Sequence, residues 1–443
     1  PYYDKVTDPA DPALYKDRDS YLYVAQKIQE DFQYALDNVR TDDTKRQVNK
    51  YVVGAYMSRE MLYHATWLKY HGTTVGPTSE KVADGDIKNL LQGAINGAEA
   101  VMNSGIYSIG NTYHALFTTD DLANNPEVIW YREYTSGLQC NALMSYNGPE
   151  DQTQGGVTQD VINTYLCSDG LPIGQSPLYQ GKEDPSIQKS FQDRDPRLYH
   201  TVIPPYKVKS GKGDYPTWSY TDNPADREYI DIMGANESCS NPGVGMKRLP
   251  GQNWSASLVP EIPRLGTGAF VTCRSCYYVW KNWDNWEPSF NNGNLNTADK
   301  PIFKIEEVLL NEAEAKFELG VFDQGVADKT INKLRDRAGV VKMVVADIND
   351  SFDPNRGKYY PKGNESGILV DPVLWEIRRE RIIELMGEGF GIYDIRRWRM
   401  APWFLNKPAT GLWMSKEEAM KNNMTLYNPE TGYSDGTDGS LTE

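Results

Sequence analysis

The stretch "IFKIEEVLLNEAEAKFELGVFDQGVADKTINKLRDRAG", residues 302–339, predicts two amphipathic helices joined by a short turn at Gly320. Apolar residues recur at helical spacing on both sides of this glycine, and the pair Leu319-Gly320 has the form of a helix end. The Ala-rich first helix, and a combined length close to the roughly 34 residues of a tetratricopeptide unit, favour a helical repeat. We therefore expect a scaffold that is built from helix pairs.

The first third of the chain carries the same periodicity. Helical patterns cover residues 20–40, 46–68 and 86–104, and the last two have the form of a second helix pair with an enlarged turn. Asp19-Ser20 offers a cap for the first of these helices. Another helix is expected at 371–386. Helices thus occupy both ends of the chain.

The middle of the chain, roughly residues 107–300, has a different character. Gly, Pro, Asn, Asp and aromatic residues are scattered through it, and its apolar runs are short. Segments such as "EVIWYREY", residues 127–134, are typical of brief strands. Long irregular loops in a compact protein tend to form binding surfaces, so we expect the ligand to bind here.

These patterns predict a mostly α fold, in which a tetratricopeptide-like helical-repeat scaffold carries a large loop-rich insertion with short strands. The expected parts are N-terminal helices at 1–106, a loop-rich ligand-binding region at 107–300, and C-terminal helices and tail at 301–443, together forming one domain. Because the chain begins at Pro1 without an initiator Met or a signal peptide, we interpret it as a mature or incompletely represented chain whose natural N-terminus is not visible.

The charge of the chain restricts its partners. A net charge of −15 argues against nucleic acid, because no basic field is available to displace counterions from phosphates. It also fits poorly with docking on anionic lipid. We expect ligands that are neutral or held by local groups. The acidic run Asp350–Asp353 lacks the spacing of an EF-hand, so neither a metal nor a cofactor is predicted.

Three tryptophans follow one another at intervals of three residues in "YYVWKNWDNWEP", residues 277–288. Trp283 and Trp286 lie in its turn-rich part, where Asn, Asp and Pro supply little apolar cover. Exposed rings are a liability unless a ligand uses them. The C–H face of a sugar stacks on an indole, so we predict a glycan platform at these two residues; packing between loops is the alternative.

Other loop aromatics are candidates for the same platform. They are Trp218 and Tyr220 in "DYPTWSYTDNP" and Trp254 in "PGQNWSAS". By contrast, Trp67, Trp375 and Trp398 lie on or beside predicted helices, and we expect them in the core.

No catalytic motif stands out, and we predict that the protein is not an enzyme. A glycosidase needs two carboxylates that face one another across a bond. The carboxylates of the predicted repeat helices are expected on a solvated face or in helix–helix pairs; they are Glu306, Glu307, Glu312, Glu314, Glu380 and Glu384. The pair Cys273 and Cys276 has no second Cys pair or suitably spaced His beside it, which leaves a bystander pair or a disulfide.

The run "GEGFG", residues 387–391, resembles a phosphate-binding loop only superficially. Such a loop follows a strand and opens a helix, whereas this run follows a predicted helix. We interpret it as a helix stop and turn. The charged residues around it are then expected to form a helix-packing ion network; they are Glu380, Glu384, Asp394, Arg396 and Arg397.

Several stretches together resemble one known family. "VLLNEAEAKFELG", "INKLRDRAGV" and "RRERIIELMGEGFGIYDIRRW" (378–398) resemble the C-terminal signature of SusD/RagB-like proteins. "SDGLPI" (168–173) and "FQDRDPRLYHTVIPP" (191–205) resemble their middle, and "AVMNSGIYSI" (100–109) their early helices. The matches keep their order over about residues 20–400. Two features depart from the family: Gly391 stands where an Arg is usual, and the family's first helices and acylated Cys do not precede Pro1.

The resemblance implies a non-catalytic, lipid-anchored protein on the extracellular face of the outer membrane of Bacteroidota. Such a protein binds a glycan, or in the alternative an oligopeptide, and acts as the lid of a SusC-like TonB-dependent transporter. The resemblance also implies a strand at 277–281, which places Tyr278 and Trp280 in the core. A glycoside hydrolase and an intracellular peptide-binding repeat adaptor remain as further alternatives.

Overall fold

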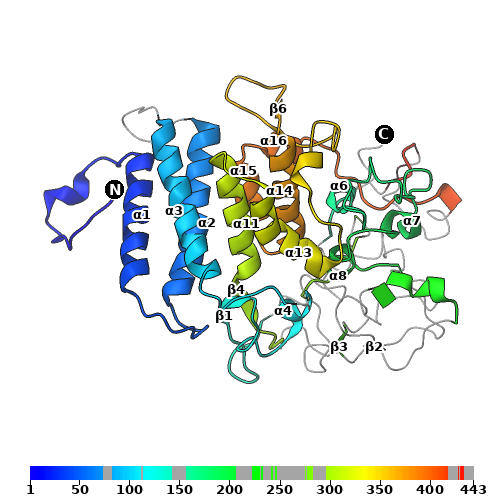
Figure 1. Ribbon diagram of the computed structural model, residues 1–443, viewed down its shortest axis with the longest axis horizontal. Helices are drawn as coiled ribbons and strands as arrows, with labels where there is room; N and C mark the ends of the chain where they lie inside the picture. The colour runs from blue at the N-terminus through cyan, green and yellow to red at the C-terminus, as the bar shows by residue number, and fades with distance from the viewer. Residues whose placement is uncertain are drawn as a thin grey trace.

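The computed structural model describes residues 1–72, 82–110, 113–141, 156–205, 222–229, 231–232, 241–242, 245–246, 275, 277–282, 296–417, 428 and 430–433. The long helices stand side by side across one half of the molecule (Figure 1). The short helices α6 and α7 lie in the other half, beyond α13 and α14 (Figure 1). This arrangement matches the expected scaffold with a loop-rich insertion.

The N-terminal helices are α1 (Tyr21–Asn38), α2 (Lys50–His71) and α3 (Asp84–Met102), and they confirm the three predicted patterns. The side chain of Asn49 caps α2 by accepting hydrogen bonds from the backbone N–H groups of Tyr51 and Val52, both at 3.0 Å. Gly54 and Gly97 let the backbones of α2 and α3 approach closely, because a Cβ atom on either would come within 2.7 Å of the other's carbonyl oxygen.

The C-terminal helices are α11 (Ile305–Glu318), α12 (Gln324–Lys329), α13 (Ile331–Ala338), α14 (Pro372–Glu384), α15 (Gly391–Arg397) and α16 (Ala401–Leu405). One detail of the prediction is wrong: the segment after Gly320 forms two helices instead of one. The helix is interrupted at Thr330, whose φ of −124° and ψ of −91° are not helical. This residue caps the end of α12 and the beginning of α13. The side-chain hydroxyl of Thr330 donates to the carbonyl oxygen of Val326 at 2.7 Å, which helps to close α12.

The middle of the chain contributes short elements. These are the helices α4 (Ala115–Thr118), α6 (Gln159–Thr164), α7 (Ile187–Phe191) and α8 (Arg197–Thr201), and the strands β1 (Val128–Arg132), β2 (Asn241–Pro242), β3 (Gly245–Met246) and β4 (Lys300–Lys304). β1 confirms the predicted strand and pairs antiparallel with β4, so the insertion closes on itself where it joins the scaffold. A small hairpin, β5 (Lys358–Tyr359) with β6 (Ile368–Leu369), lies in the C-terminal part.

Single 3-10 turns complete the described elements: η1 (Pro12–Tyr15), η2 (Pro224–Asp226) and η4 (Val345–Asp347).

Helix α11 forms the centre of the scaffold, with every residue from Ile305 to Ala315 buried. Its apolar side chains, among them Leu309 and Ala313, share one core with Ile331 of α13 and Ile377 of α14. Because α11 is covered all round, its glutamates are buried as well. Glu306, Glu307, Glu312 and Glu314 therefore occupy no solvated face. Glu306, Glu307 and Glu314 pair with arginines of other helices, which was the other expectation, whereas Glu312 pairs with Lys316 of α11 itself.

Candidate functional site

All five aromatic residues predicted to bind the ligand lie outside the described residues. They are Trp218, Tyr220, Trp254, Trp283 and Trp286. Cys273 and Cys276 also lie outside. The glycan platform therefore stays a prediction, and the structure bears on it through the residues that precede it in the chain.

The residues just before Trp283 are fixed firmly. Tyr278 and Trp280 are buried as expected, and the Trp280 indole donates to the carbonyl oxygen of Tyr199 at 2.7 Å. The expected strand at 277–281 is reduced to two isolated bridges, Tyr278 with Gly156 and Val279 with Val202. Side chains of both faces of this segment are nevertheless buried, among them Tyr277 and Tyr278.

The expected core tryptophans differ in burial. Trp398 and Trp375 are buried, which confirms the expectation for them. Trp67 is only half-buried, and its ring stacks on His71 with the ring centroids 3.9 Å apart.

Lys281 anchors this segment to the scaffold. Its side chain is 1% exposed, and its ammonium donates to the carbonyl oxygens of Glu384 at 3.0 Å and Met386 at 2.9 Å. It also donates to the carboxylate of Glu388 at 2.8 Å, and Lys304 reaches the same carboxylate at 2.8 Å. The two ammonium groups hold the pKa of Glu388 below its usual value against the effect of burial.

The lysine therefore binds the "GEGFG" turn. Gly387 and Gly389 of that turn have φ values of 77° and 88°, a region that favours glycine, and they lie between α14 and α15. The interpretation of this run as a helix stop and turn is confirmed.

A cavity of about 750 Å³ opens where Lys281 meets this turn, and we call it the α2–α15 pocket. Its lining comes from α2, α4, β4, α11, α14, the "GEGFG" turn and α15, together with Asn282. The aromatic and polar side chains that line it include Tyr56, Arg59, Glu60, Tyr63, Asn282 and Tyr393. Trp283 is the next residue after Asn282 in the chain. A residue that lines the pocket therefore directly precedes the predicted platform in the sequence.

Arg59 supplies a fixed donor to this pocket. Its guanidinium forms a bidentate pair with Glu307, through distances of 2.6 and 2.5 Å, and lies over the rings of Phe303 and Phe390 at 3.9 and 5.0 Å. This leaves Nη1 without a hydrogen-bond partner among the described residues. The arginine is held rigidly while one of its nitrogens stays available to a ligand.

Glu60 supplies an acceptor beside it. Its side chain is 31% exposed, and its ion-pair contact in the described part of the chain is His64 at 3.9 Å. Burial lowers the pKa of His64 to about 4, so this histidine is neutral at pH 7 and gives Glu60 no charge partner. Burial also raises the pKa of Glu60.

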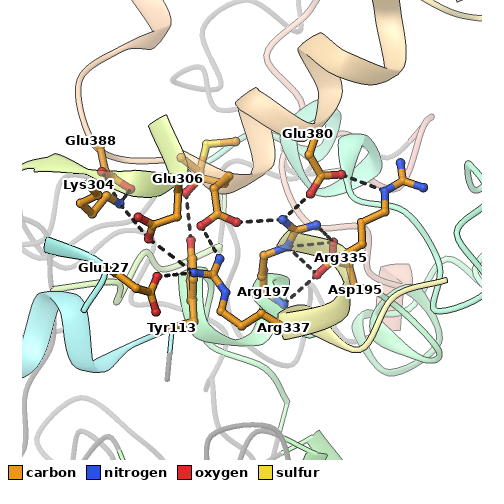
Figure 2. Close-up of polar contacts among 12 residues, drawn as sticks. Tyr113, Glu127, Asp195, Arg197, Lys304, Glu306, Arg335, Arg337, Glu380 and Glu388 are labelled. Atoms are coloured by element: carbon orange, nitrogen blue, oxygen red, sulfur yellow. Dashed lines mark hydrogen bonds and ion pairs between the residues drawn. The ribbon is translucent and has the colours of Figure 1, made fainter. Parts of the chain in front are cut away.

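Behind the pocket lies a buried ion network, whose residues point toward one another in Figure 2. Arg337 donates to Glu127 at 2.8 Å, approaches Glu306 at 3.4 Å and also bonds Glu384. Arg197 of α8 donates to Asp195 at 2.7 Å, to Glu380 at 2.6 Å and to Glu384 at 2.8 Å.

Arg335 extends the network through Glu380 at 3.0 Å (Figure 2). Segments far apart in the sequence therefore meet through charge. The network joins α8 and Glu127, the residue before β1, to α11, α13 and α14 of the scaffold.

The network holds its acids in different protonation states. Despite burial, the charges of Arg337, Arg197 and Lys304 lower the pKa of Glu384 to about 2. Burial and the neighbouring Glu127 instead raise the pKa of Glu306 well above its usual value. Glu384 is therefore ionised at pH 7, whereas the surroundings of Glu306 disfavour its charged form.

The predicted helix-packing network is confirmed for Glu380, Glu384, Asp394 and Arg397. Arg397 pairs with Asp394 at 2.9 Å, and it also bonds Glu314 of α11 at 2.6 Å. Arg396 differs from the prediction: it is exposed, and its guanidinium lies over the Trp67 ring at 5.7 Å. On the short helix α15, Arg397 faces the core and its neighbour Arg396 faces outward.

Sequence reasoning missed Arg59, Glu60, Lys281 and Asn282. The signal for Lys281 was present, because a lysine between Trp280 and Trp283 interrupts an aromatic run. In the described part of the chain, no three His, Cys, Asp or Glu side chains gather in a way that could hold a metal ion. A search of the same residues finds no helix both long and apolar enough to span a membrane.

This architecture is similar to that of known proteins. A family model described as the SusD family matches residues 126–440. A search of the curated proteins finds no match. Among solved structures, the chain is similar to a SusD-like carbohydrate binding protein from Bacteroides fragilis NCTC 9343, with 17% identity and a TM-score of 0.61 over 98% of this chain and 70% of that one.

A second solved structure supports the same fold. A SusD-like protein from the same organism is 19% identical, with a TM-score of 0.54 over 94% of this chain and 67% of that one. At these identities the structures support the fold, and the family match over residues 126–440 supports the assignment. The chain belongs to the SusD family.

Proposed function

We propose that this protein captures a neutral oligosaccharide or polysaccharide at the cell surface and passes it to a SusC-like TonB-dependent transporter. The observation that carries the proposal is the α2–α15 pocket. Its aromatic walls adjoin Asn282, the residue before Trp283, as do a donor and an acceptor that form no hydrogen bond with any described residue. A relative of the same fold is described as a carbohydrate binding protein, which agrees with this class of ligand.

The chemistry of the pocket suits a sugar. A pyranose presents an apolar C–H face and a rim of hydroxyls, each of which both donates and accepts hydrogen bonds. Tyr56 and Tyr393, which are 44% and 57% exposed, offer rings to the face. Arg59 and Asn282 offer donors to the rim, and Glu60 offers an acceptor. Because free donors and acceptors occur together, a neutral polyhydroxylated ligand fits better than a strongly charged one.

The remaining steps follow from the family. The protein would be a lipid-anchored, non-catalytic component of the outer membrane, with its helices packed on the transporter as a lid. Closure follows when the closed lid binds the glycan more tightly than the open one, since a ligand shifts an equilibrium only by its differential affinity.

Calorimetric titration of the full chain with neutral polysaccharides, their oligosaccharides and mixed peptides tests this function. The double variant Tyr56→Ala/Tyr393→Ala is expected to weaken glycan binding by roughly 10- to 100-fold, since each lost ring is worth about 1 kcal/mol or more. Trp283→Ala/Trp286→Ala is expected to do the same if the platform continues the pocket. Tyr34→Ala is the control, because this tyrosine is 72% exposed on α1 and does not line the pocket.

Two outcomes would replace the proposal. Binding of peptides alone would make the protein an oligopeptide receptor, in which Arg59 and Glu60 meet the charged ends of the peptide. Release of shorter sugars during the titration, seen by chromatography, would instead make it a hydrolase. The partner is tested separately, by co-purification of the anchored protein with a TonB-dependent barrel from outer membranes.

A further inference from the structure

A second cavity, of about 710 Å³, lies between the β5–β6 hairpin and α16, and we call it the hairpin pocket. Both elements lie along one edge of the molecule in Figure 1. Its lining residues are Tyr360, Pro361, Lys362, Gly363, Asn364, Glu365, Arg399, Pro402, Trp403, Asn406 and Lys407. None of them lines the α2–α15 pocket. The two linings come nearest in sequence at Arg397, which lines the α2–α15 pocket, and Arg399, which lines the hairpin pocket.

The hairpin pocket is positively charged although the chain carries a net charge of −15. Its cations are Arg399, Lys362 and Lys407, against the single carboxylate of Glu365. Lys407 also lies 3.4 Å from Asp160, but both of these side chains are well exposed, and such pairs are weak in water. The cavity therefore keeps an excess of positive charge.

Arg399 is held there by a costly backbone conformation. Its φ is 55°, in the left-handed region, where among the described non-glycine residues only Asp193 joins it. The conformation is locked on both sides: the Arg399 N–H donates to the carbonyl oxygen of Arg396, and the Arg399 carbonyl oxygen accepts from the Tyr360 N–H, both at 3.0 Å. The left-handed region is strained for a non-glycine residue, and such outliers gather at functional sites.

The guanidinium of Arg399 has capacity left for a ligand. One nitrogen, Nη1, donates to the carbonyl oxygen of Tyr70 at 3.3 Å, and its other N–H groups have no acceptor in the part of the chain that the structure covers. The charge of Arg399 also acts on His71. Burial lowers the pKa of this histidine, and the positive charges of Arg399 and Arg396 lower it further.

Neutral groups in the same cavity suit a sugar ring. Trp403 and Tyr360 supply apolar surface, and the ammonium of Lys407 lies 4.1 Å from the centroid of the Trp403 ring. The side-chain oxygen of Asn364 accepts from the N–H groups of Ser366 and Gly367, both at 3.1 Å, which turns its amide nitrogen away from them. Asn406 adds a second carboxamide.

We propose that the hairpin pocket is a second ligand site that binds a sugar carrying a carboxylate, a hexuronate residue. Arg399 pairs with the carboxylate, Lys362 adds charge, and the rings and carboxamides contact the rest of the sugar. A bare phosphate would leave the rings and carboxamides unused. The site is separate from the α2–α15 pocket, so the protein would hold a neutral backbone at one pocket and an acidic residue at the other.

A matched pair of ligands tests the site in the full chain. An oligosaccharide that bears glucuronic acid is titrated beside the same oligosaccharide with its carboxyl group reduced to the alcohol. We expect the acidic form to bind roughly tenfold more tightly at low salt, with the difference shrinking as salt is added. Arg399→Asn should abolish the difference, because asparagine tolerates the left-handed conformation but carries no charge.

Two further variants complete the test. Lys342→Ala is the control, since this exposed cation pairs with Asp336 and does not line the pocket. Lys362→Ala replaces Arg399→Asn if thermal unfolding shows that the latter is not folded. Equal binding of the acidic and reduced ligands, or a difference that survives both pocket variants, would overturn the proposal.

Other outcomes separate this site from the proposed function and from lipid. Preference for the acidic ligand that survives Tyr56→Ala/Tyr393→Ala supports a separate site, even if neutral glycans fail to bind the protein at all. Binding of phosphatidylglycerol vesicles that is lost in Arg399→Asn, without any preference for the acidic sugar, would make the pocket a lipid-headgroup site and overturn the assignment to a sugar.

Discussion

The buried ion network and the α2–α15 pocket use charged residues in opposite ways. In the network Arg197 is 1% exposed and bonds three carboxylates, so its donors serve other parts of the same chain. In the pocket Glu60 is 31% exposed beside a neutral histidine, and one nitrogen of Arg59 has no partner among the described residues. The difference separates charge that fixes the fold from charge that remains available to a ligand.

The separation has a physical basis. Removing one partner of a buried pair leaves an uncompensated charge in a medium of low dielectric constant, so such groups tolerate little change. Half-exposed groups keep contact with water and lose little when a ligand replaces it. The network can therefore hold the insertion rigidly against the scaffold while the pocket beside it stays free to bind.

The largest expected effect comes from Arg197→Met. The variant keeps most of the apolar stem but leaves Asp195, Glu380 and Glu384 with less compensation, so we expect the free energy of unfolding at pH 7 to fall by about 3 to 5 kcal/mol. Urea denaturation followed by tryptophan fluorescence measures it.

The control for Arg197→Met is Arg227→Ala. Arg227 pairs with Asp231 at 2.6 Å, with side chains 30% and 51% exposed, and should lose no more than about 1 kcal/mol. If the two variants were equally stable, the contrast between buried and exposed charge would fail.

Two glutamates of the network should respond differently to amidation. Glu384→Gln removes a charge that Arg337 and Arg197 both use, and we expect a loss of about 2 to 3 kcal/mol at pH 7. Glu306→Gln replaces a carboxyl group whose charged form is disfavoured by burial and by Glu127, so we expect its unfolding free energy to change by less than about 1 kcal/mol. The comparison uses the same denaturation assay, and a larger loss in Glu306→Gln would contradict it.

The pH dependence follows from the same two groups. The pKa of Glu384 is lower in the folded protein, so its contribution to stability is present above about pH 4.5 and is lost as the pH falls toward 2. The pKa of Glu306 is raised in the folded protein, so its contribution is present at low pH and is lost as the pH rises through the folded value. Glu384→Gln should therefore flatten the acid limb of the stability curve, and Glu306→Gln should not.

Periodicity in the sequence was enough to predict the scaffold. The helices around Ile28, Leu62, Leu90 and Leu309 repeat apolar residues at a spacing that only a helix can bury on one side. The break at Thr330 and the burial of Glu306 and Glu314 were not predictable in this way. The burial of these two glutamates depends on which arginines of other helices lie opposite them, and that pairing is set by tertiary contacts between residues far apart in the chain.

The candidate site was harder to predict. Trp283 and Trp286 are large aromatic residues in a polar, turn-rich segment, which marks them in the sequence as candidates for binding. Arg59, Glu60 and Tyr63 instead lie in a helical pattern that gives no sign of a site. Their exposure at a pocket depends on α15 and the "GEGFG" turn, more than 300 residues later in the chain. Sequence pattern finds the residues that stand out, but it cannot find a surface assembled from distant helices.

Lys281 connects the buried ion network with the α2–α15 pocket, because it bonds the backbone of Glu384 and directly precedes Asn282. Its substitution is therefore the sharpest test of whether the two regions are coupled. Lys281→Met keeps the buried stem but removes the donors for the carbonyl groups of Glu384 and Met386, while Glu388 keeps Lys304. We expect stability to fall by about 1 to 2 kcal/mol, less than for Arg197→Met or Glu384→Gln.

Because Lys281 fixes the chain just before Asn282 and Trp283, we expect Lys281→Met to weaken neutral glycan binding by roughly tenfold. Lys316→Met is the comparison: it loses partly buried ion pairs with Glu312 and Glu99 at 2.7 and 3.1 Å but lies outside the pocket lining, so affinity should not change. Full glycan affinity in a folded Lys281→Met protein would show that the anchor serves only the fold. The two regions would then be neighbours without being coupled.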